Sequence, residues 1–125
     1  MSRVIKPSGV KTSEEAKKLD QAFDGRHAVM SKCIDKQDNR SSWWSIEDLE
    51  NYIAYAKEQA AKLNYQLTGI RAYEGAEEDM GYTTIFLAPT GYSKTGRAAG
   101  NGDIPGGDVL NAGGNGNPPS ANYPQ

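Results

Sequence analysis

The stretch from residue 43 to residue 90 constrains the fold most, because it has the pattern of a capped amphipathic helix followed by a two-stranded hairpin. Ser45 is suited to the helix N-cap, and Asp48 takes the capping-box position after it. Apolar residues, Ile53 among them, then recur at helical spacing, and Asn64 can adopt the left-handed conformation that ends a helix. We therefore predict a helix whose apolar face packs on a sheet.

Two strands follow this helix and are joined by the polar loop EGAEEDMG: 66–73 and 82–88. We expect Tyr73 to face Tyr82 across the hairpin. Antiparallel pairing then sets Arg71 opposite Thr84 and gathers all of these side chains on one face. The aliphatic residues take the other face, where the helix packs.

An N-terminal helix is also expected, with Ser13 as its cap and Gly25 in the left-handed position that ends it. Residues 40–44 form a candidate short strand that could join the sheet beside 66–73. The predicted fold class is α+β: a small single domain in which an amphipathic helix packs on a two- to three-stranded sheet with a C-terminal antiparallel hairpin.

The C-terminal part of the chain is unlike a domain. Residues 90–125 hold nine of the fourteen glycines and four of the six prolines, with few apolar residues. Such a segment buries too little apolar area to offset about 1–2 kcal/mol of backbone entropy per ordered residue. We therefore expect a flexible N-terminus over 1–9, an α+β domain over 10–89, and a flexible Gly/Asn/Pro-rich tail over 90–125 that is dispensable for folding.

Composition excludes several classes of protein. The net charge is −2, which gives no polyelectrolyte signature, and the single cysteine, Cys33, rules out an internal disulfide framework. Without Cys/His spacing typical of zinc sites, we expect no metal and no cofactor. The start of the chain has no apolar signal-peptide region, and no apolar run approaches the ~20 residues of a membrane span. A cytoplasmic protein that does not bind a membrane is expected.

Three runs resemble those of a group of small uncharacterised bacterial proteins. They are W-x-S-x-E-x-L-x-x-Y-I from Trp43, G-I-R-x-Y-x-G-A from Gly69, and T-T-x-F-x-x-P-T from Thr83. The resemblance covers about residues 38–90. It implies one module there and supplies no activity and no site.

Two groups of residues have the chemistry of a catalytic or metal site. Asp24, His27 and Cys33 could serve as orienter, base and nucleophile, but nothing in the sequence activates the thiol, and a packed cysteine with a surface histidine is favoured. The acidic loop 77–79, with Glu74, offers oxygen ligands for a hard cation but lacks the alternating spacing of a calcium loop. A solvated turn is the favoured interpretation, so we assign no catalytic residue.

The binding candidates are stronger. Arg71 can present a planar fork to a carboxylate or phosphate, although its stem could instead lie over aromatic rings or the guanidinium could pair with an acid of this chain. Trp43 and Trp44 point to opposite sides if extended, so one of them is a candidate for a partner surface. The predicted binding residues are Arg71, Tyr73, Tyr82, Thr84 and Trp43.

We therefore expect a non-catalytic binding or adaptor module that uses this sheet face to recognise a protein or a small anionic ligand. One alternative is a small enzyme with the Cys/His or acidic-loop site. The other is a single-strand nucleic acid binder that stacks bases on the sheet tyrosines, which the negative charge near the hairpin disfavours.

Overall fold

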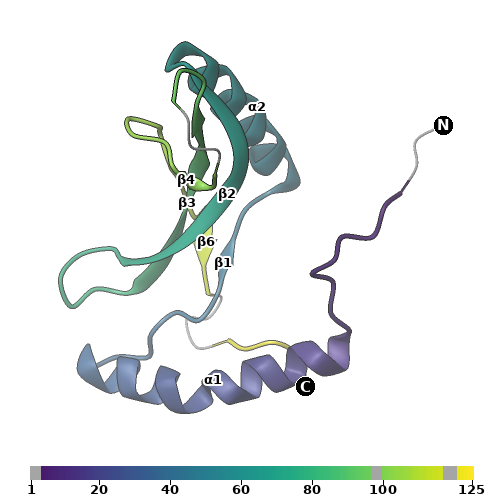
Figure 1. Cartoon of the computed structure of the whole chain (residues 1–125). Coiled ribbons are helices and arrows are strands. Elements are labelled where there is room, and N and C mark those ends of the chain that lie inside the picture. The colour runs from purple at the N-terminus through teal and green to yellow at the C-terminus, as the bar shows by residue number, and fades with distance from the viewer. Residues whose placement is uncertain (1–3, 97–99, 117–120) are drawn as a thin grey trace.

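A long antiparallel hairpin forms the centre of the structure (Figure 1). β2 (Tyr65–Ala76) pairs with β3 (Thr83–Ser93), and α2 (Ile46–Lys62) packs against β2. The computed structural model describes residues 4–96, 100–116 and 121–125. It confirms the α+β fold class, with an amphipathic helix on an antiparallel hairpin.

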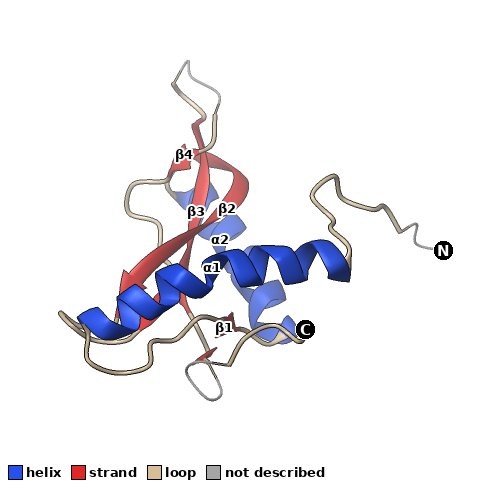
Figure 2. Ribbon diagram, turned by 90° about the horizontal axis from the view of Figure 1, so that it is seen from below, coloured by secondary structure: helices blue, strands red, loops and turns tan. Residues whose placement is uncertain are grey.

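The remaining elements in the described residues are one helix and four very short strands: α1 (Ser13–Cys33), β1 (Ser42–Trp43), β4 (Gly102–Asp103), β5 (Leu110–Asn111) and β6 (Gly114–Asn115). β4 and β5 both pair with β3, on the edge away from β2, while β1 and β6 form a separate two-stranded sheet. α1 lies at the other end of the molecule from α2, and the view from below shows it in front of the hairpin (Figures 1 and 2). In the described part of the chain, neither helix is long and apolar enough to cross a membrane.

The bounds of α1 differ from those expected. Thr12, not Ser13, is the N-cap: its hydroxyl accepts the Glu15 N–H at 3.1 Å, and its own N–H donates to the Glu15 carboxylate at 3.0 Å. The helix also continues through Gly25 to Cys33. Glycine costs about 1 kcal/mol in a helix, and the two turns after it make buried contacts through His27 that offset this cost.

α2 begins and ends as predicted, but its buried face is narrower. The Ser45 hydroxyl accepts the Asp48 N–H at 2.9 Å, and Asn64 has φ 63°. The buried residues are one tyrosine and two alanines at successive i,i+4 positions: Tyr52, Ala56 and Ala60. Ile53 is 41% exposed, so it lies at the rim of this face and not in the core. Small alanines allow the helix to approach the sheet closely, which leaves the longer side chains outside.

The register of the hairpin is shifted by four residues from the expected one. Tyr73 pairs with Phe86 instead of Tyr82, and Arg71 pairs with Ala88 instead of Thr84. Stacking of the Tyr73 and Phe86 rings, with centroids 5.3 Å apart, favours this longer hairpin with a tighter loop. An even shift preserves the faces, so Arg71, Tyr73 and Thr84 still lie on the same side of the sheet.

The structure also corrects the predicted boundary at residue 89. β3 continues to Ser93, and residues 100–116 supply β4, β5 and β6. Ile104 in this segment is only 4% exposed and belongs to the core, and its N–H donates to Pro89 O at 3.0 Å. Near the C-terminus, the Tyr123 hydroxyl lies 3.1 Å from the Ser13 hydroxyl on α1. Residues 4–9 are exposed, and residues 97–99 and 117–120 of the predicted tail lie outside the described residues.

The small core offers a direct test of this correction. Ile104→Ala should lower the free energy of unfolding by about 2–5 kcal/mol, because it opens a cavity in a buried site. Val109→Ala, in the same segment but 51% exposed, should change it by no more than about 0.5 kcal/mol. Urea denaturation measures both. Equal, negligible effects would mean that the segment does not pack on the domain.

Candidate functional site

Two of the predicted binding residues converge on one carboxylate, that of Asp103. Arg71 Nη1 lies 3.1 Å from Asp103 Oδ1, and the Tyr73 hydroxyl donates to Asp103 Oδ2. The other terminal nitrogen of Arg71 donates to the backbone carbonyl of Asn101 at 2.7 Å. The guanidinium therefore binds the Asp103 carboxylate and, at the same time, a backbone carbonyl two residues earlier in the chain. We call Arg71 and Tyr73 the carboxylate cradle.

The strand order explains this geometry. Arg71 and Tyr73 are alternate residues of β2 and share one face, while Asp103 lies on β4, at the other side of β3 and paired with Thr90. Arg71 must therefore reach across β3, where the residue paired with it, Ala88, has only a small side chain. Stacking on Phe86 fixes the ring of Tyr73 and so directs its hydroxyl.

The cradle is open to solvent. The side chains of Arg71 and Asp103 are 43% and 44% exposed. Beside them is a hollow of about 350 Å³ whose walls include Thr68, Gly69 and Thr90. An ion pair this exposed is worth about 0.2–1 kcal/mol. The contact is therefore weak enough to exchange with a carboxylate from outside the chain.

The other predicted residues lie elsewhere. Thr84 is buried, where it donates to Asn111 Oδ1 at 3.0 Å and accepts from Asn115 Nδ2 at 2.9 Å. Tyr82 lies outside β3, with the Lys36 ammonium 4.2 Å from its ring centroid. Trp43 is on β1 and lines a separate cavity. The structure therefore brings together Arg71 and Tyr73 but not the remaining predicted residues.

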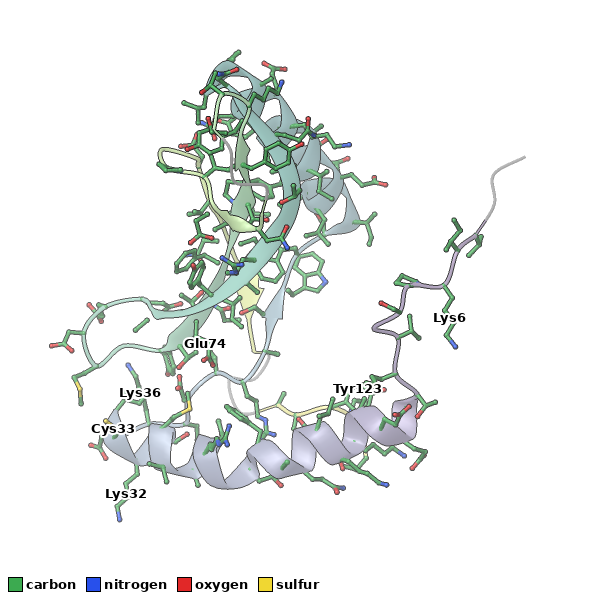
Figure 3. All side chains as sticks on the ribbon, in the orientation of Figure 1. Lys6, Lys32, Cys33, Lys36, Glu74 and Tyr123 are labelled. Atoms are coloured by element: carbon green, nitrogen blue, oxygen red, sulfur yellow. The ribbon has the colours of Figure 1, made fainter. Side chains whose placement is uncertain are left out.

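The structure separates the members of the proposed catalytic trio. Cys33 is exposed at the C-terminal end of α1 (Figure 3), His27 is buried, and Asp24 pairs with Arg40 at 3.0 Å. His27 Nε2 lies 2.8 Å from the carbonyl oxygen of Asp38 and must donate its proton there. That nitrogen is not available to accept a proton, so His27 holds the loop after α1 in place.

The acidic loop does not gather into a ligand set. Glu77, Glu78 and Asp79 are all exposed, and Glu74 belongs to β2 (Figure 3). Among residues 4–96, 100–116 and 121–125, no three His, Cys, Asp or Glu side chains are grouped so that they could hold a metal ion.

Sequence reasoning missed the partner of the cradle, because Asp103 lies in the predicted tail. The same is true of Asp108, whose carboxylate accepts from the Tyr55 hydroxyl at 2.5 Å and from Gln59 Nε2 at 2.9 Å. One signal was present: Ile-Pro-Gly-Gly at 104–107 is a turn sequence between two acidic residues.

The contact between Asp108 and α2 shifts the pKa values of both Asp108 and Tyr55. Hydrogen bonds from Tyr55 and then from Gln59 hold the pKa of the Asp108 carboxyl below its usual value. The bond to Asp108, together with its negative charge, raises the pKa of the Tyr55 hydroxyl. The ionised carboxylate thus anchors the segment after β4 to α2.

Comparison with known proteins finds no family model, no curated protein and no solved structure that matches this chain. The chemistry of the cradle itself is specific: a guanidinium and a phenol donate to the two oxygens of one carboxylate. The cradle thus supplies the donors that a carboxylate accepts from.

The lowered pKa of Asp108 predicts how stability depends on pH. A carboxyl with a lowered pKa stabilises the fold above its ordinary pKa of about 3.9, and this contribution is lost as the pH falls through the lowered value. Tyr55→Phe removes the main cause of the shift. The variant should be less stable than wild type near pH 6, and the difference should shrink near pH 2.5.

Urea denaturation at about these two pH values measures the effect. Tyr92→Phe, which removes a phenol at the far end of β3, should leave the acid dependence unchanged. A Tyr55→Phe difference that is the same at both pH values would contradict the account of Asp108.

Proposed function

We propose that this protein is a non-catalytic binding module that recognises an acidic segment of a partner protein through the carboxylate cradle. One observation carries the proposal: Arg71 and Tyr73 hold both oxygens of a carboxylate supplied by another strand. The chain's own Asp103 acts in place of the partner's acid. A cytoplasmic location, expected from the sequence, belongs to the same proposal.

The contacts favour a peptide over a small anion. Arg71 binds the Asp103 carboxylate and also the carbonyl of Asn101, two residues earlier in the chain. An extended peptide with an acidic residue reproduces both contacts, and it can pair with β3 in place of β4. A free acid reproduces only the first. In such a peptide, we expect the residue after the acid to contribute less to recognition. Its counterpart in this chain, Ile104, points into the core and not toward the cradle.

The alternative functions have weaker support. An enzyme would need a base close to its nucleophile, whereas Cys33 is exposed and His27 is buried with Nε2 bonded to a backbone carbonyl. A single-strand nucleic acid binder would need free aromatic faces, whereas the ring of Tyr73 is stacked on Phe86 and its hydroxyl is bound to an acid.

The proposal predicts that removing the internal acid opens the cradle. Asp103→Ala should bind N-acetyl-aspartate methylamide about two- to sixfold more tightly than wild type, because a competing pair worth about 0.2–1 kcal/mol is gone. A titration followed by protein NMR measures both affinities. Signals of β2 and β4 should move.

Two further variants make this test specific. Asp79→Ala removes an equal charge from the exposed hairpin loop and should bind the probe as wild type does. Adding Arg71→Lys to Asp103→Ala should weaken binding about tenfold, because lysine keeps the charge but lacks the fork. The proposal is wrong if Asp103→Ala, shown to be folded by its thermal unfolding, gains no affinity over Asp79→Ala.

A further inference from the structure

A second hollow lies at the other end of the molecule. It has a volume of about 660 Å³, and its lining includes Asp20, Arg40, Trp43 and Tyr123. Figure 3 shows Tyr123 on the C-terminal segment beside α1. This volume falls within the range of about 300–1,000 Å³ that is usual for small-molecule sites.

Aromatic rings and bare backbone form the apolar wall. Trp43 is 64% exposed and Tyr123 is 40% exposed, so neither ring is consumed by the core. Gly114 pairs with Trp43 across β1 and β6, and a Cβ atom at Gly114 would meet no atom within 4 Å. The space at Gly114 is therefore open, whereas a Cβ atom at Gly113 would lie 3.7 Å from the indole ring of Trp43.

The polar wall, together with the acid paired to it, carries a net negative charge: Asp20 and Arg40 line the cavity, and Asp24 pairs with Arg40. The two terminal nitrogens of Arg40 each bind one carboxylate at 3.0 Å, those of Asp20 and Asp24. The Arg40 side chain is only 6% exposed, so its donors are used within the protein. One guanidinium with two carboxylates leaves a charge of −1. This wall repels anions and attracts cations.

We propose that this cavity binds a small organic cation with an alkylated ammonium group. Methylated ammonium ions bind over the faces of tryptophan and tyrosine, because the ring quadrupole is negative there and the methyl groups lose little hydration. The net negative charge of Asp20, Arg40 and Asp24 together adds to this attraction. The inference is independent of the carboxylate cradle, since the two sites share no residue.

Choline and its uncharged isostere 3,3-dimethyl-1-butanol test the proposal on the full-length protein. Their shapes match, so a difference in affinity reports the charge. We expect choline to shift the indole N–H signal of Trp43 but not that of Trp44, whose N–H donates to Asn111 O at 2.8 Å. The isostere should bind about tenfold more weakly. Equal binding of the two probes, or no shift with choline, overturns the proposal.

Two variants locate the site. Trp43→Leu should weaken choline binding about tenfold, as measured by ligand-observed NMR, while the Trp44 indole signal keeps its position and reports an intact fold. Asp24→Asn, at a largely exposed carboxylate, makes the cluster of Asp20, Arg40 and residue 24 neutral and should weaken the binding of choline but not of the isostere. Undiminished choline binding in both variants places the ligand elsewhere and overturns the assignment.

Discussion

The docking of residues 100–116 onto the hairpin is the interaction on which the rest of the structure depends. It is made largely by short polar side chains that bond to four elements: Asp103 to β2, Asp108 to α2, Asn111 to β3, and Asn115 to β1 and β3. This docking places Ile104 in the core and fills the cradle of Arg71. It also builds β6, without which Trp43 would have no partner strand and the second cavity would lack Gly114 in its lining.

A second polar cluster fixes α1. Asp38 is only 2% exposed. Its carboxylate accepts from the backbone N–H groups of Asn39 and Thr83 at 2.8 and 2.7 Å, and its own backbone N–H donates to the Ser31 hydroxyl on α1. The buried charge is thus compensated by hydrogen bonds and links α1 to the hairpin. In both clusters, directional bonds set the position of an element that buries little apolar surface. Both hollows border the docked segment: the smaller one at Asn101, and the larger one at Gly114 and Gly116.

The sequence predicted what apolar periodicity and capping determine. α2, its Ser45 cap, the hairpin and the face shared by Arg71 and Tyr73 all follow from spacing. The register did not follow, because an even shift leaves the pattern of faces unchanged. The docked segment was missed for a related reason: a flexible tail and a segment docked by polar side chains can both be rich in asparagine and aspartate. Only the fold shows that Asp103 reaches the guanidinium of Arg71.

The central claim is that Arg71 holds the Asp103 carboxylate in solution. Side-chain ¹⁵N NMR at low temperature tests it directly, because a guanidinium bound at both terminal nitrogens rotates slowly and gives separate signals for them. Arg40, held by two carboxylates, is an internal reference. The account predicts separate signals for Arg71 in wild type that merge in Asp103→Ala, while those of Arg40 stay unchanged. Merged Arg71 signals already in wild type would contradict it.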